Sequence, residues 1–110
     1  MVAESPFAVF DQSNFDAAVL AHRGLVLVDF WSQTCAPCRQ LSKVLEQLSA
    51  EISPGVRIGT VDADANPLLL QRFGVQGLPT LLFFKDGGEV ERRTGVDRRQ
   101  VLKKLVEAHA

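Results

Sequence analysis

Short apolar runs recur along the chain at intervals that leave room for helices between them. The runs cover residues 7–10, 25–31, 56–61 and 78–84, and each is predicted to be a β-strand. The run at 25–31 is apolar at every position before its terminal Trp31 except Asp29, a pattern typical of a central strand covered on both faces. We therefore expect a buried sheet that carries an ionisable group inside its central strand.

Capping patterns predict the first and last helices. Ser13 with Asp16 resembles a capping box ahead of a helix at residues 15–22, which Gly24 would close. Asp97 with Gln100 is expected to cap the final helix in the same way. The apolar stripe of that helix consists of Val101, Leu102, Leu105 and Val106.

Helical spacing also predicts two helices in the middle of the chain. One follows a pair of cysteines and ends at Pro54-Gly55 at the latest, and its apolar stripe consists of Leu41, Val44, Leu45 and Leu48. The other begins with Asn66 as N-cap and Pro67 in the first turn, and Gly74 ends it.

A hairpin is expected after the last apolar run. Residues 85–88, Lys-Asp-Gly-Gly, turn the strand at 78–84 into an antiparallel partner at 89–94. Since the earlier strands alternate with helices and no repeat or linker interrupts them, the sequence predicts an α/β fold, a mixed sheet flanked by helices, in one domain spanning residues 1–110.

Composition and charge narrow the range of functions that the chain can have. A chain of 110 residues that is 46% hydrophobic can build a core without disulfide staples or a structural metal. Its formal charge of −1, from 12 basic and 13 acidic side chains, provides no field for nucleic acid or an anionic membrane. We expect neutral partners, proteins or small thiols, and a monomer.

The cellular location is predicted from two absences in the sequence. The first residues carry no basic and apolar leader pattern, and no later apolar run approaches membrane-spanning length. These features predict a cytoplasmic protein. Because thiols are kept reduced there, two cysteines are more often catalytic or metal-binding than structural.

Cys35 and Cys38 are the only cysteines, and they lie at the start of a predicted helix directly after the central strand. Such a pair can form a disulfide or remain as two neighbouring thiols. A helix start stabilises a thiolate at Cys35 through unpaired amides and the helix dipole, while Pro37 has no amide to leave unpaired. Cys38, one turn deeper, should be less exposed.

The pair predicts a two-step disulfide reduction. Cys35 attacks a substrate disulfide, and Cys38 resolves the mixed disulfide from within the same molecule. Asp29 is the natural acceptor for the Cys38 proton if burial raises the pKa of its carboxyl group. The alternative is that Asp29 is simply a paired structural polar group of the core.

Other interpretations of these residues remain open on spacing alone. Trp31 could be ordinary core packing, and Pro79 could be a trans proline at a sheet edge. A structural zinc site needs four ligands, and besides the cysteines the chain offers only His22 and His109 as nitrogen ligands. We expect no metal in a monomer, although two chains could share zinc or an iron–sulfur cluster.

Six motifs in order resemble the thioredoxin family over almost the whole chain. They are Val-Asp-Phe-Trp at 28–31, Cys-Ala-Pro-Cys at 35–38, Asp-Ala-Asp-Ala-Asn-Pro at 62–67, Phe-Gly-Val at 73–75, Gly-Leu-Pro-Thr at 77–80 and Phe-Lys-Asp-Gly at 84–87, followed by Gly95. The resemblance implies a thioredoxin fold, with about five strands and four helices, and a dithiol-disulfide reductase acting on client proteins. It further implies no bound cofactor and recharging by a thioredoxin reductase that uses NADPH.

The resemblance also implies a substrate site. The Leu78-Pro79 bond would be cis and lie against the cysteines, so that the Leu78 backbone pairs with an extended substrate. The remaining residues expected in the docking patch are Trp31, Ala36, Pro37, Gly77, Gly95 and Val96.

Four positions depart from the usual family pattern. Thr34 replaces a tryptophan, Ala36 a glycine, Lys43 a helix-kinking proline and Thr60 a lysine near the buried aspartate. Loss of that lysine should make Asp29 harder to ionise, and loss of the proline should straighten the helix. The changes at 34 and 36 also leave open a binding or scaffold protein with specialised partners and little redox turnover.

Overall fold

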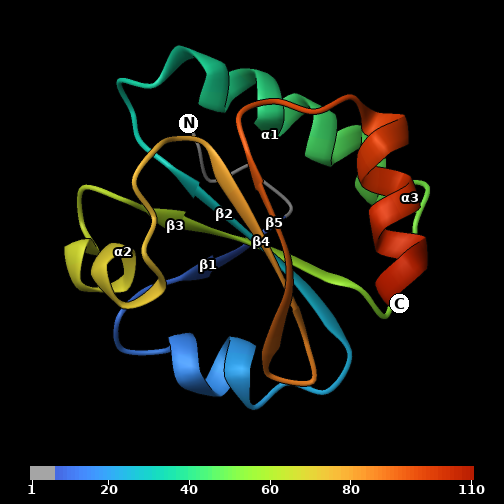
Figure 1. Ribbon diagram of the computed structural model, residues 1–110, viewed down its shortest axis with the longest axis horizontal. Helices are drawn as coiled ribbons and strands as arrows, with labels where there is room; N and C mark the ends of the chain where they lie inside the picture. The colour runs from blue at the N-terminus through green and yellow to red at the C-terminus, as the bar shows by residue number, and fades with distance from the viewer. Residues whose placement is uncertain (1–6) are drawn as a thin grey trace.

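The computed structural model describes residues 7–110, and these residues form one five-stranded sheet (Figure 1). The strand order is β1-β3-β2-β4-β5. β1, β3 and β2 are parallel, and β4 and β5 are antiparallel to their neighbours. The mixed sheet and the central position of β2 are therefore confirmed. The strands are β1 (Ala8–Phe10), β2 (Leu25–Trp31), β3 (Arg57–Asp62), β4 (Thr80–Lys85) and β5 (Gly88–Thr94).

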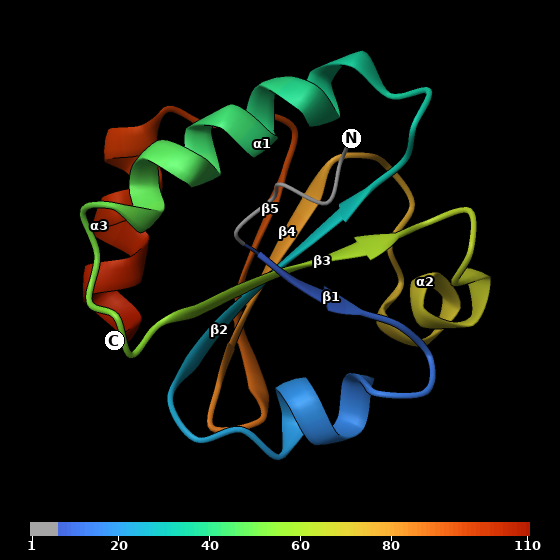
Figure 2. The ribbon, with the colours of Figure 1, turned by 180° about the vertical axis from the view of Figure 1, so that it is seen from behind.

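Helices cover both faces of the sheet, as Figures 1 and 2 show. α1 and α3 cover one face, and η2, a π-helical segment, covers the other together with α2. The four helical segments of the described chain are η2 (Asp16–Leu20), α1 (Ala36–Ser49), α2 (Pro67–Phe73) and α3 (Arg99–His109).

The alternation of β2 divides the core into two layers. Leu25 and Leu27 pack with residues of α1 and α3, whereas Val26, Val28 and Phe30 pack with residues of η2 and α2. All five side chains are at most 2% exposed. Because successive strand residues point to opposite faces, the residue at position 29 lies on the α1 side of the sheet.

The predicted capping box at the first helix is wrong. Asp11 accepts hydrogen bonds from the backbone amides of Ser13 (2.8 Å) and Asn14 (3.0 Å), and the Ser13 hydroxyl also donates to Asp11. An Asx turn at Asp11 therefore uses the hydroxyl that the capping box needed. Asp16 instead pairs with Arg72 at 2.7 Å.

The first helix is also shorter than predicted. It ends at Leu20, and Ala21 is its C-cap. Gly24 does not close the helix but leads into β2 with a φ of 102°, and its amide donates to Asp86 Oδ1 at 2.7 Å. This bond joins the start of β2 to the hairpin turn between β4 and β5.

The start of α2 is capped by a residue far away in sequence. Asn66 is the N-cap as predicted, followed by Pro67, but its side chain makes no capping bond. Its oxygen accepts from the amide of Gln12, whose own side-chain oxygen accepts from the Leu68 amide at 3.1 Å. The loop after β1 thereby caps α2. At the other end Gly74 is left-handed (φ 64°), as expected of a helix-ending glycine.

The predicted cap of the last helix is wrong as well. α3 begins at Arg99, with Arg98 as N-cap and no side-chain cap. The Asp97 carboxylate is held by Arg93 of β5, with distances of 2.9 and 3.2 Å. A cross-element ion pair has thus replaced the local cap.

Candidate active site

Three connections meet at one end of the sheet and bring the predicted site residues together (Figure 1). They are the β2–α1 loop at 32–35, the segment at 75–79 that leads into β4, and the β5–α3 connection at 95–98. The Gly95 amide donates to the Pro79 carbonyl at 2.9 Å, which joins the second to the third. β2 ends beside them at Trp31, which is partly exposed.

Cys35 and Cys38 form a disulfide with a Cα–Cα distance of 5.3 Å. Cys35 is the N-cap of α1, and its sulfur accepts a hydrogen bond from the Cys38 amide at 3.2 Å. Cys35 is half-buried, whereas Cys38 is only 3% exposed. Ala36 and Pro37 form the exposed first turn between them. The outer and inner positions of the two sulfurs agree with the sequence prediction.

Asp29 is a buried carboxyl group that forms no ion pair with residues 7–110. It is 2% exposed, and its Oδ1 makes no hydrogen bond with any residue of 7–110. Burial raises the pKa of this carboxyl from 3.8 to about 7. Thr60 lies opposite Asp29 in the β2–β3 register and supplies no positive charge there. The expectation that Asp29 is hard to ionise therefore agrees with the structure.

The segment that precedes β4 has the backbone form that the family resemblance implied. The Leu78-Pro79 bond is cis. The Leu78 amide and carbonyl make no hydrogen bond with the residues that the structure describes. The Thr80 hydroxyl donates to the Gly77 carbonyl at 2.5 Å and fixes the turn on one side. Val96, across from this segment, is 39% exposed.

One residue of the site was missed in the sequence. Arg39 follows the Cys pair, and its guanidinium donates to the Gln33 carbonyl at 3.2 Å, across the β2–α1 loop. A side-chain bond to a backbone carbonyl carries no residue pattern that a sequence could reveal. Arg39 therefore helps to hold the loop that presents Cys35.

Two further features of the described residues concern metal ions and membranes. Within residues 7–110, no group of three or more His, Cys, Asp or Glu side chains could hold a metal ion. None of the described helices has the length and apolar character needed to cross a membrane.

Comparison with known proteins adds to this geometry. The family model described as Thioredoxin matches residues 6–108. A thioredoxin of Chlamydia muridarum is 46% identical over 101 residues, which cover 92% of this chain and 96% of the relative. A thioredoxin of Bacillus subtilis is 40% identical over 86 residues, or 78% of this chain and 83% of the relative.

Proposed function

This chain belongs to the thioredoxin family and is a thiol-disulfide oxidoreductase, and from that premise we propose that it reduces protein disulfides with Cys35 as nucleophile and Cys38 as resolving thiol. The observation that supports this division of roles is the asymmetry of the pair. Cys35 is the more exposed residue of the two, and its sulfur accepts a hydrogen bond from the Cys38 amide. That hydrogen bond would stabilise a thiolate at Cys35.

The proposed reaction has two exchange steps. The Cys35 thiolate attacks one sulfur of the client disulfide, and the other client sulfur leaves as a thiolate. Cys38 then loses its proton and attacks Cys35, which releases the second client sulfur and forms the Cys35–Cys38 disulfide. Two electrons have passed from the dithiol to the client.

We propose that Asp29 accepts the proton that Cys38 loses. Cys38 and Asp29 are both buried, and both lie on the side of the sheet that α1 covers. A carboxyl group with a pKa of about 7 is partly ionised at neutral pH, so it can accept a proton there and return it later. No cation competes for the Asp29 carboxylate within its strand pairing.

The client segment is expected to bind across the three connections. The unpaired Leu78 backbone would form strand-like hydrogen bonds with an extended peptide. The apolar surface around it would consist of Trp31, Ala36, Pro37, Gly77, Pro79, Gly95 and Val96, which we call the docking patch.

The cycle requires a source of electrons outside this chain. We propose that a thioredoxin reductase using NADPH returns the Cys35–Cys38 disulfide to the dithiol, as the family membership suggests. A monomer in the cytoplasm, with no nucleic acid or membrane partner, fits the charge of −1 and stays a prediction.

The test is a trapping experiment with two matched variants. Cys38→Ser is expected to accumulate mixed disulfides with a protein disulfide substrate, because the resolving sulfur is missing. Cys35→Ser is expected to form none and to lose reductase activity. Mixed disulfides would be counted by non-reducing electrophoresis and mass spectrometry. Trapping by Cys35→Ser but not by Cys38→Ser would reverse the assigned roles.

A further inference from the structure

A groove of about 360 Å³ extends the docking patch along α1. Val96 lines the groove and also belongs to the docking patch, so the two surfaces are continuous. The β5–α3 connection runs beside α1 in both Figure 1 and Figure 2. The groove is lined by Gln40, Lys43 and Val44 of α1 and by Val96, Asp97 and Arg98 of the connection.

The charges of the groove are unbalanced although the chain as a whole is nearly neutral. Lys43 and Arg98 are exposed, and neither has an ion pair or a side-chain hydrogen bond with the residues of 7–110. Asp97 is the one acid that lines the groove, and its carboxylate is already bound by Arg93. Two unpaired cations therefore stand beside an apolar floor made by Val44 and Val96.

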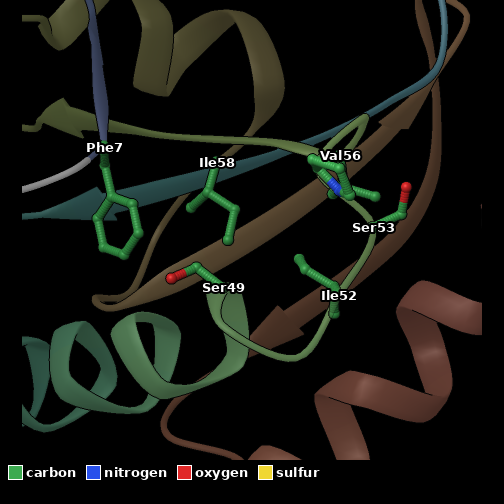
Figure 3. Close-up of a pocket in the computed structure, with 7 residues that line it drawn as sticks. Phe7, Ser49, Ile52, Ser53, Val56 and Ile58 are labelled. Atoms are coloured by element: carbon green, nitrogen blue, oxygen red, sulfur yellow. The ribbon is translucent and has the colours of Figure 1, made fainter.

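A second cavity, of about 140 Å³, differs from the groove in the chemistry of its lining. It lies at the opposite end of α1, where Ser49 and Ile52 face Phe7 and Ile58 (Figure 3). Apolar and hydroxyl-bearing residues line it, and no charged residue does. Its lining gives no indication of a ligand's chemistry.

We propose that the groove binds an acidic segment of the disulfide client and so selects among clients. This proposal rests on the proposed function, because the groove matters only if a client disulfide is held at Cys35. Electrostatic complementarity of this kind mainly sets specificity and association rate.

The geometry of α1 sets the position of the acidic residues in the client. Lys43 lies seven residues after Ala36, the first residue of the helix, which is about 10 Å along the axis. An extended peptide covers that length in about three residues. The client should therefore carry Asp or Glu about three to four residues from the cysteine under attack.

The probes are symmetrical peptide dimers, each joined by one disulfide and bearing self-quenching fluorophores. Three peptides differ only at the third and fourth positions on both sides of the cysteine, which are Glu, Gln or Lys. The reduced protein converts each dimer to two free thiols and becomes the Cys35–Cys38 disulfide. Each rate is divided by the rate with a small neutral dithiol, which removes differences in intrinsic disulfide reactivity.

The wild-type protein is expected to reduce the Glu dimer about threefold to tenfold faster than the Gln dimer at low ionic strength, the size that two exposed charge pairs provide. High salt should abolish the difference. The double variant Lys43→Glu/Arg98→Glu should lose the preference for Glu and favour Lys instead. The control variant Arg23→Glu/Lys104→Glu has the same net charge as the groove variant, but both its positions are exposed and lie outside the groove. It should therefore keep the preference for the Glu dimer.

Equal rates for the Glu and Gln dimers would overturn the proposal. It would also be overturned if the groove variant kept the preference for Glu, or if the control variant lost it. Neither result would touch the proposed function, because the dimers would still be reduced. If no dimer were reduced by the wild-type protein, the proposed function itself would fail.

Discussion

Replacing Asp29 with asparagine should make the protein more stable at alkaline pH and remove the part of the pH dependence of its stability that comes from this carboxyl group. Asparagine has nearly the same shape but cannot ionise. The carboxyl of Asp29 is 2% exposed, and its Oδ1 has no hydrogen-bond partner among the described residues. Its pKa is about 7 because burial disfavours the charged form.

The sign and size of this pH effect on the free energy of unfolding follow from the pKa values of Asp29 in the unfolded and folded states. In the unfolded chain Asp29 releases its proton near pH 3.8, whereas in the folded protein it does so near pH 7. Between these values the folded state binds the extra proton, so the free energy of unfolding falls as pH rises. At about 1.4 kcal/mol per pH unit the full cost approaches 4 kcal/mol above pH 7. About 3 kcal/mol of it develops between pH 5 and pH 8.

Urea unfolding of the oxidised protein at several pH values would measure this. The difference in unfolding free energy between Asp29→Asn and wild type should shift by about 3 kcal/mol in favour of the variant from pH 5 to pH 8. Any constant cost of the buried amide cancels in that shift. Asp64→Asn, at an exposed position, serves as the control and should follow wild type. Parallel pH profiles for wild type and Asp29→Asn would refute the argument.

Three further substitutions test the scaffold by urea unfolding. Leu45→Ala should cost about 2–5 kcal/mol, because Leu45 is fully buried under α1. Gly87→Ala should destabilise the protein more than Gly24→Ala, although both glycines have positive φ. A Cβ at position 87 would collide with a backbone carbonyl of η2, whereas a Cβ at position 24 would meet open space. Equal losses of stability would contradict this. Gln12→Ala should lose about 1 kcal/mol by uncapping α2 at the Leu68 amide, and an unchanged midpoint would show that the cap adds nothing.

The strands were predictable because burial leaves a strong pattern in the sequence. β2 was placed to the residue, since its apolar run is bounded by Gly24 and the Cys pair. β3 was shifted by one residue, and β4 begins two residues later than expected. The delay in β4 has a local cause, because Pro79 has no amide hydrogen to donate to the ladder, and the pairing with β2 reaches only to Thr80.

The side-chain hydrogen bonds that cap the helices were the part that sequence could not predict. A capping box is inferred from residues close together in the chain, but the polar groups here had partners elsewhere. Asp97 pairs with Arg93 across a turn, and Gln12 caps a helix that begins 55 residues later at Pro67. Competition between local and distant partners depends on the three-dimensional arrangement. The Cys35–Cys38 pairing and the burial of Asp29 were predictable, because the first depends on residue type and spacing and the second on the apolar strand around it.

The central place of β2 has a consequence for how the molecule fluctuates. Its backbone pairs with β3 on one side and β4 on the other, and the loop after its carboxyl end leads to Cys35, the N-cap of α1. Amide hydrogens in such a strand exchange with solvent only when the whole domain opens, whereas edge strands such as β1 and β5 can fray on their own. Deuterium uptake should therefore be slowest in residues 25–30. The reactive pair lies at the start of α1, shortly beyond the part of the molecule that should open last.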